Sequence, residues 1–341
     1  MDDRIVGILG GGQLGRMLTE AAHRLNIQVA VLDAEGAPAK QINGQKPQIT
    51  GSFADPKAIR QLAEECDILT VEIEHVDTDT LEEIANGTEL REDWRRVRRR
   101  KVEVQPSWRT IRVIQDKYRQ KEHLIEQGVK TAESLPLESN TSEEAEKAGK
   151  SLGYPFMLKA RTDAYDGRGN YAVHTPGDIG AAIHSLGQRP LYAEKWANFK
   201  SELAVMVVKI ESAADPGSWQ RSTLAYPVVE TIHEDSICKL VYAPARGIAG
   251  KLSTKAQDLA RRAVAGLWGT GVFGVEMFLL DNENLLINEM APRPHNSGES
   301  RSPLLSLLSR LCWGWGRSAE LLVDRSLHDR SLPGIPVRCP P

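Results

Sequence analysis

The sequence predicts an α/β protein in which a parallel sheet comes first and antiparallel strands follow. An apolar run (residues 4–9), glycines 10–12 and a segment with helical periodicity (residues 13–25) form the pattern of a strand–turn–helix unit. Farther along, a strand–polar loop–strand segment (156–173) predicts two more strands, and a hairpin pattern (275–290) predicts antiparallel pairing. We therefore expect two kinds of sheet in one chain.

The glycine-rich turn of the first unit predicts a place where an anion can bind. Gly10, Gly12 and Gly15 fit the G-x-G-x-x-G spacing, and the next strand (27–32) ends at Asp33. Free backbone N–H groups at a helix N-terminus attract phosphates, and the gap to Asp33 suits a dinucleotide. Many open α/β sheets use the same turn without a dinucleotide, so the motif alone leaves the ligand open.

Two further charged positions are candidates for a ligand site. Glu74 follows a predicted strand (68–73), and the carboxyl ends of parallel strands are where open α/β sheets bind ligands. Lys117 lies within a single predicted helix (107–127). Both residues are equally typical of a solvated surface.

A lysine and a glycine-containing loop predict a phosphate-binding region in the middle of the chain. The predicted strand 156–160 carries Lys159 among apolar neighbours, where a cation needs a partner anion. The polar loop 163–170 can fold over phosphates, but it lacks the spacing of a P-loop. Further predicted elements are the strands 191–196, 202–209 and 226–233 and the helix 252–267.

The strongest local pattern is a hairpin near residue 280. Two apolar runs (275–280 and 285–290) flank four polar residues (281–284). A symmetric hairpin about this turn pairs Leu280 with Leu285.

The same pairing places Glu276 opposite Glu289. Like charges that face each other destabilise a strand pair, and a buried carboxylate without a partner is costly. A Mg²⁺ ion would remove both penalties, because it binds one or two carboxylates together with water and phosphate oxygens. The alternative is an exposed sheet edge with solvated acids.

Composition excludes several classes of function. The chain has 341 residues with a formal net charge of −3, which gives no electrostatic case for binding nucleic acid. The start of the chain does not resemble a signal peptide, and no apolar run is long enough to span a membrane. The four cysteines are far apart and show neither metal-ligand nor disulfide spacing, so we expect a cytoplasmic protein.

Four motifs resemble one enzyme family. They are GGGQLGRM at 10–17, QDKY at 115–118, YDGRG at 165–169 and LINEMAPRPHNSG at 286–298. Over about residues 3–298 the chain resembles the ATP-grasp superfamily, and within it the 5-(carboxyamino)imidazole ribonucleotide synthases of purine biosynthesis. The sequence is similar to the eukaryotic form of this synthase, which is fused to a carboxylase/mutase domain.

The resemblance implies an ATP-grasp architecture with ATP clasped between two α+β subdomains. The implied divisions are a Rossmann-like N-terminal domain (1–104), a small subdomain with a lid loop (105–190) and a large subdomain (191–298). The tail (299–341) does not resemble the family's C-terminal domain, which supplies a basic segment for the substrate phosphate. We therefore expect that domain to be lacking.

The implied reaction is an ATP-dependent ligation with ATP and Mg²⁺ as cofactors. ATP would phosphorylate bicarbonate to carboxyphosphate, which would carboxylate 5-aminoimidazole ribonucleotide to 5-(carboxyamino)imidazole ribonucleotide, with release of ADP and phosphate. The implied partners are these small molecules, the carboxylase/mutase domain of the fused form and a second copy of the chain in a homodimer. Neither a nucleic acid nor a membrane is implied.

The resemblance also implies roles for individual residues. The implied metal ligands are Glu276 and Glu289, and the implied catalytic residues are Lys159, Arg168 and Arg293. The residues implied to contact ATP, with the backbone of 194–197 as the adenine-binding hinge, are Lys117, Lys159, Glu194, Lys195, Trp196, Ala197, Glu202, His233, Asn288 and Glu289. The residues implied to contact the ribonucleotide or bicarbonate are Gly12, Gln13, Leu14, Glu74, Tyr165, Asp166, Gly167, Arg168, Arg293, Asn296, Ser297 and Gly298.

Three other functions remain open at this point. The chain as written fits a catalytically inactive nucleotide-binding module, since the C-terminal domain is expected to be absent. A related ATP-grasp ligase, such as the formate-using purine transformylase, is a second candidate. The glycine-rich turn allows an NAD-dependent oxidoreductase, which offers no role for Glu276 and Glu289.

Overall fold

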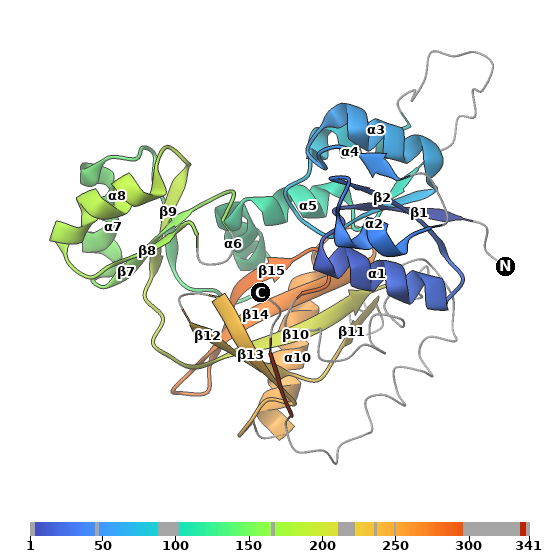
Figure 1. Cartoon of the computed structure of the whole chain (residues 1–341). Coiled ribbons are helices and arrows are strands. Elements are labelled where there is room, and N and C mark those ends of the chain that lie inside the picture. Colours follow the sequence, from blue (N-terminus) through green and yellow to red (C-terminus); the bar gives the residue numbers. More distant parts are fainter. Residues whose placement is uncertain are drawn as a thin grey trace.

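Three sheets organise the chain, one parallel and two antiparallel (Figure 1). This computed structural model describes residues 4–44, 48–87, 102–164, 168–210, 222–234, 237–248 and 250–295 and the backbone of a strand at 335–338. The expected combination of sheet types is confirmed. Within those residues, no helix has both the length and the apolar character needed to cross a membrane.

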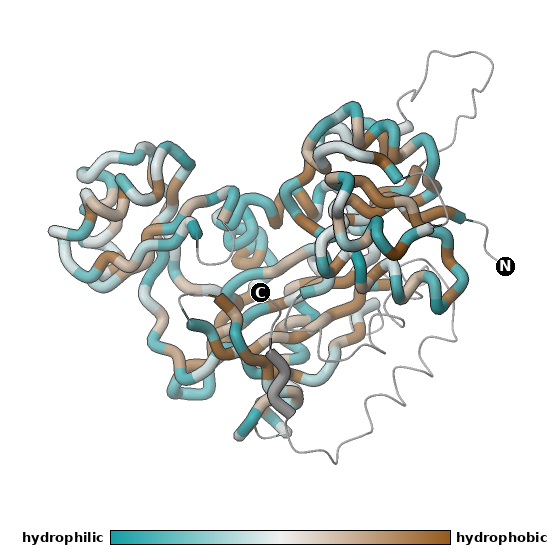
Figure 2. The backbone as a smooth tube through the Cα atoms, in the orientation of Figure 1, coloured by the Kyte–Doolittle hydropathy of each residue, from teal (hydrophilic) through white to brown (hydrophobic). Residues whose placement is uncertain are grey.

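The N-terminal sheet is parallel, and helices cover both of its faces. Its strand order is β3-β2-β1-β4-β5, with β1 at Ile5–Leu9, β2 at Gln28–Asp33, β3 at Ile49–Thr50, β4 at Ile68–Val71 and β5 at Glu103–Val104. The helices are α1 (Gln13–Arg24), α2 (Pro38–Ile42), α3 (Pro56–Glu65) and α4 (Thr78–Ala85). Because both faces are covered, the strands are continuous apolar runs, drawn brown in Figure 2.

The expected single helix over 107–127 is wrong. Two helices lie there, α5 (Trp108–Gln115) and α6 (Lys117–Glu126), and Asp116 between them has extended backbone. The Asp116 carboxylate accepts backbone N–H groups at 3.0 Å and 3.1 Å and so caps the second helix. Helical periodicity alone does not reveal a cap inside an otherwise continuous pattern, which explains the error.

The small antiparallel sheet has the order β6-β9-β7-β8. Its elements are β6 (Ser134–Pro136), α7 (Ser142–Leu152), β7 (Phe156–Ala160), β8 (Asn170–Val173), α8 (Ile179–Leu186) and β9 (Leu191–Lys195). The two helices share one apolar core with the sheet. In Figure 1 this unit and the N-terminal sheet lie at opposite sides of the molecule.

The large antiparallel sheet has the order β15-β14-β10-β12-β13-β16, with β11 paired to β10. Its elements are β10 (Phe199–Lys209), β11 (Thr223–Ala225), β12 (Val229–Glu234), β13 (Ile237–Ala243), α10 (Gly250–Ala265), β14 (Gly271–Leu280), β15 (Leu285–Ala291) and β16 (Ile335–Arg338). Helix α10 shares a core with one face of this sheet. Met206, Val208 and Val272 share a second core with β1 and α1, which joins the large sheet to the N-terminal one.

The hairpin forms as expected but with a different register at its tip. Glu276 pairs with Glu289 as predicted, whereas Leu285 pairs with Leu279 and not with Leu280. A bulge between the two levels absorbs the extra residue, Asn288. The bulge interrupts strict side-chain alternation beside Glu289.

One buried glutamine joins α6 to the hairpin. Gln120, with only 1% of its surface exposed, donates to the Met290 carbonyl oxygen at 2.9 Å and accepts the Met290 N–H at 2.8 Å. The amide thus satisfies both backbone groups of an edge-strand residue, as an additional strand would. This contact fixes the start of α6 beside β15.

We predict that Gln120→Leu lowers the free energy of unfolding by about 2–4 kcal/mol, because it leaves two buried backbone groups without partners. Urea or thermal unfolding measures this loss. The matched control is Ile125→Ala on the same helix, where the side chain is 58% exposed. A Gln120→Leu variant as stable as the control would contradict the docking role.

Candidate active site

The centre of the site is the pair of carboxylates on the hairpin. Glu276 on β14 and Glu289 on β15 are register partners, and the His295 Nε2 atom lies 3.2 Å from Glu276 Oε1. Burial, with the neighbouring charge of Glu289, raises the pKa of Glu276 to about 7. Burial also opposes ionisation of Glu289, but the nearby lysines outweigh it and lower the pKa of that carboxyl. One carboxyl is therefore charged near neutral pH while the other titrates.

Lys117 is the cation closest to this pair. It is the first residue of α6, and its Nζ atom lies 3.0 Å from Glu289 Oε2. Burial disfavours the ammonium, yet Glu289 and Glu74 together raise its pKa above the ordinary value. The Lys117 N–H donates to the Arg161 carbonyl oxygen at 2.8 Å, which fixes the helix start against the small sheet.

A second buried ion pair connects the N-terminal sheet to the end of the hairpin. Arg293 Nε donates to Glu74 Oε2 at 2.7 Å, and Glu74 follows β4 by three residues. Burial disfavours the Glu74 carboxylate, but Arg293 and Lys117 lower its pKa to about 2. The pair thus keeps a charged guanidinium at the edge of the parallel sheet.

On the small sheet, Lys159 and Glu194 face each other across paired strands. Lys159 Nζ on β7 lies 3.2 Å from Glu194 Oε1 on β9, and both side chains are mostly buried. Burial opposes the ammonium, but Glu194 raises the pKa of Lys159 well above its ordinary range. On the large sheet, Glu202 and His233 form a further contact between neighbouring strands.

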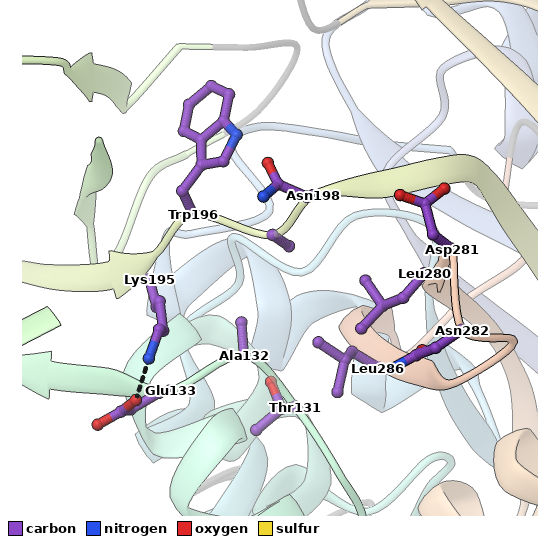
Figure 3. Close-up of a pocket in the computed structure, with 11 residues that line it drawn as sticks. Thr131, Ala132, Glu133, Lys195, Trp196, Asn198, Leu280, Asp281, Asn282 and Leu286 are labelled. Atoms are coloured by element: carbon purple, nitrogen blue, oxygen red, sulfur yellow. Dashed lines mark hydrogen bonds and ion pairs between the residues drawn. The ribbon is translucent and has the colours of Figure 1, made fainter. Parts of the chain in front are cut away.

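A cavity of about 360 Å³ lies between the link that follows β9 and the tip of the hairpin (Figure 3). Its lining residues are Thr131, Ala132, Glu133, Lys195, Trp196, Ala197, Asn198, Leu280, Asp281, Asn282 and Leu286. Leucine and alanine side chains give it an apolar floor, and Lys195 pairs with Glu133 at 3.1 Å on its rim. Its size suits a flat aromatic ring system.

The glycine-rich first turn holds carboxylates in this structure. The Gly11 N–H donates to Asp33 at 2.6 Å, and Glu72 accepts backbone N–H groups of Gly12 and Gly15. A Cβ atom on Gly10, which has a φ of +100°, would lie 2.4 Å from the Glu72 carboxylate. Acids therefore occupy the amides that a dinucleotide phosphate would need, which argues against an NAD site.

Comparisons with known proteins agree on one family. Residues 122–301 match the ATP-grasp domain, and residues 4–115 match the ribonucleotide synthetase preATP-grasp domain. The N5-carboxyaminoimidazole ribonucleotide synthase of Staphylococcus aureus (strain MRSA252) is 31% identical over 86% of this chain and 71% of its own length.

The chain belongs to the ATP-grasp superfamily and, within it, to the family of the N5-carboxyaminoimidazole ribonucleotide synthases.

A solved structure of the N5-carboxyaminoimidazole synthase of Aspergillus clavatus, in complex with ADP and 5-aminoimidazole ribonucleotide, matches with a TM-score of 0.82. It is 49% identical, and the match covers 93% of this chain and 78% of that one. The phosphoribosylaminoimidazole carboxylase of Saccharomyces cerevisiae is 51% identical over 298 residues, which are 87% of this chain and 49% of the relative. The chain thus spans about half the length of such curated relatives. The expected ATP-grasp fold class is confirmed.

The structure brings most of the predicted nucleotide-site residues of this ATP-grasp chain into two neighbouring groups. One group surrounds the hairpin and comprises Lys117, Glu276, Glu289 and the bulge residue Asn288. The other surrounds β9 and its link and comprises Lys159, Glu194, Lys195, Trp196 and Ala197. Glu202 and His233 contact each other on β10 and β12.

The structure describes only some of the residues that were predicted to contact the substrates. Glu74 and Arg293 are in direct contact, whereas Arg168 is exposed at the start of the segment after the lid loop. Gly12 and Gln13 lie at the N-terminus of α1, and the Leu14 side chain is buried in the fold, so only its backbone can face a ligand. The predicted positions outside the described residues are Tyr165, Asp166, Gly167, Asn296, Ser297 and Gly298.

Sequence reasoning missed Lys121, which contacts Glu194 and is only 2% exposed. A signal was present. Lys121 stands seven residues after Ile114 and three before Leu124, both fully buried, so it continues the apolar stripe of the helical pattern. A lysine in such a stripe needs a buried anion.

We predict that Glu74→Gln destabilises the protein by about 3 kcal/mol at neutral pH, because the pKa of Glu74 falls from 4.5 to about 2 on folding. A lowered folded-state pKa gives stability that is fully present above pH 4.5 and is lost as the pH falls toward 2. The stability difference from the wild type should therefore shrink between pH 5 and pH 3.

Urea unfolding at several pH values measures this difference, with the exposed Glu65→Gln as the control. A difference between wild type and Glu74→Gln that is independent of pH would refute the assignment of the pKa shift to the Arg293 pair.

Proposed function

We propose that the protein catalyses the ATP-dependent carboxylation of 5-aminoimidazole ribonucleotide with bicarbonate. The observation that carries this proposal is the partly buried Glu276–Glu289 pair with Lys117 beside it, in a member of this ATP-grasp family. Bicarbonate is a poor electrophile, so ATP would convert it to carboxyphosphate before the amine attacks. Phosphoryl transfer needs mainly positioning and charge neutralisation, which acids, lysines and a hard cation provide.

The acids at the hairpin fit Mg²⁺ by their chemistry. Carboxylate oxygens are the protein ligands that Mg²⁺ prefers, and two are enough when phosphate and water complete the shell. Among the described residues, no group of three or more His, Cys, Asp and Glu side chains is placed to hold a metal, so a shell made of protein alone is not expected. Glu276 and Glu289 would hold the ion, which would neutralise charge on the phosphate oxygens.

The lysines would hold the phosphates from two sides. Lys117 comes from α6 beside the hairpin, and Lys159 comes from the small sheet. Both pKa values are raised, so both side chains are charged at neutral pH. A phosphate chain between them would exchange their present carboxylate contacts for phosphate contacts without leaving a buried cation unpaired.

The adenine ring would lie against the link 195–197, whose backbone borders the cavity in Figure 3. Leu280 and Leu286 give that cavity an apolar side, and Trp196 stands on its rim with 37% of its surface exposed. The ribose would then lie near Glu202 and His233, one strand further into the sheet.

The ribonucleotide and bicarbonate would bind where Glu74 and Arg293 meet. A charged guanidinium at this point suits the bicarbonate or carboxyphosphate anion. A substrate phosphate at the glycine-rich turn would compete with Glu72 for the amides of Gly12 and Gly15. The cytoplasmic location and the homodimer expected from the sequence stay predictions, as does a partnership with a carboxylase/mutase domain.

The proposed function predicts ADP release that depends on both bicarbonate and aminoimidazole ribonucleotide, with Mg²⁺ present. A coupled assay for ADP measures this release. Glu289→Gln should abolish it, because the cation loses a ligand and Lys117 loses its counter-ion. Glu283→Gln in the exposed hairpin turn is the matched control and should leave the rate unchanged.

Other outcomes distinguish the competing functions. Stabilisation by Mg-ADP without ribonucleotide-dependent turnover would indicate an inactive nucleotide-binding module and overturn the carboxylation proposal. Turnover with formate in place of bicarbonate would indicate a transformylase. A rise in melting temperature with NAD but not with Mg-ADP would indicate the oxidoreductase.

A further inference from the structure

The most deeply buried cation of the site is a lysine that the proposed mechanism does not use. Lys121 on α6 is 2% exposed, and its Nζ atom contacts Glu194 Oε2. The same Nζ atom donates to Thr131 Oγ1 at 2.9 Å and to the Asn288 carbonyl oxygen at 3.3 Å. Three oxygen atoms around one nitrogen match the three N–H donors of an ammonium group.

These three contacts join three parts of the nucleotide site. Glu194 is the next-to-last residue of β9, the strand that leads into the link beside the cavity. Thr131 lines that cavity, and Asn288 is the bulge residue next to Glu289. Lys121 itself is not among the residues that line the cavity. Its effect on a nucleotide must therefore pass through its neighbours.

The neighbour that matters is Glu194, which stands between two cations. Its Oε2 atom contacts Lys121, and its Oε1 atom lies 3.2 Å from Lys159 Nζ. With Lys121 present, the two lysines and Glu194 together carry a net charge of +1, so Glu194 does not neutralise Lys159 alone. Without Lys121, Glu194 and Lys159 would form a neutral buried pair, and separating that pair would be costly because both groups are desolvated.

We infer that Lys121 is a positioning residue, which shares the charge of Glu194 so that Lys159 can turn toward the phosphates of the nucleotide. This inference rests on the proposed ATP site. Burial lowers the pKa of Lys121, and contact with Glu194 opposes that shift, which is the balance expected for a cation held only by a buried carboxylate.

The test compares binding of ADP with binding of adenosine, because only ADP carries the phosphates that Lys159 would meet. Isothermal titration with the full chain measures both affinities in the presence of Mg²⁺. In Lys121→Met we expect ADP to bind at least tenfold more weakly while adenosine binding changes less than twofold. The matched control is Lys150→Met, an exposed lysine on α7 that pairs only loosely with Glu146 at 3.9 Å.

A second variant separates charge sharing from simple structural support. Lys121→Met/Glu194→Gln removes the cation and the carboxylate together, so Lys159 regains its free positive charge. We expect the preference for ADP over adenosine to return to within about threefold of the wild type. In this variant Glu289 remains a counter-charge near the Lys159 ammonium, so the variant also serves if Lys121→Met folds too weakly to titrate.

The inference is overturned if Lys121→Met weakens ADP and adenosine equally, since Lys121 would then only support the fold around the cavity. It is also overturned if the double variant loses its preference for ADP by tenfold or more. Failure of the proposed function looks different, because the wild-type chain would then bind Mg-ADP without ribonucleotide-dependent turnover. Failure of the ATP site itself would appear as a wild-type chain that does not bind Mg-ADP.

Discussion

The arrangement of the site depends on two carboxylates that strand pairing places opposite each other. Glu276 and Glu289 cannot move apart without breaking the β14–β15 ladder, and both are partly withdrawn from water. The structure separates their pKa values, with Glu276 raised and Glu289 lowered, so that only one of them needs to be ionised in the absence of a cation. A cation that binds between the two carboxylates would remove the repulsion between them, so the pair favours binding of a positive charge.

The start of α6 links this pair of carboxylates to the small and the large antiparallel sheets. Asp116 ends one helix, begins the next and accepts three hydrogen bonds from the Arg161 guanidinium on the small-sheet side. The next residue, Lys117, reaches Glu289, and Gln120 binds the Met290 backbone. A helix of ten residues therefore connects the small sheet, the large sheet and the carboxylates.

The parts of the fold that follow from local pattern were predictable. Three predicted elements are present in the structure: the hairpin, the first strand–turn–helix unit and the strand that carries Lys159. Each is a short, regular pattern of apolar residues bounded by polar or glycine residues. The opposed glutamates followed from counting outward from the turn. The count gave the correct pairing partner for Glu276 and the wrong one for Leu285, because a bulge adds one residue between the two positions. The hydrophobic pattern of the sequence does not reveal that bulge.

What the sequence could not reveal depends on contacts between distant segments. The partnership of Glu74 with Arg293 joins positions 219 residues apart, and no local period encodes it. The break at Asp116 reflects a distant partner, Arg161, which directly follows β7. The carboxylates in the glycine-rich turn likewise come from the ends of β2 and β4, the two strands on either side of β1. The protein itself therefore occupies a motif that is typical of a phosphate site.

The most direct test of this account is the number of protons released when Mg-ADP binds at pH 7. Calorimetric titrations in buffers of different ionisation enthalpy give that number. Because the pKa of Glu276 is about 7, a cation that binds its carboxylate should displace a substantial fraction of a proton in the wild type and none in Glu276→Gln. Equal proton release by the two proteins, or none by either, would contradict the role of the opposed carboxylates as the cation site.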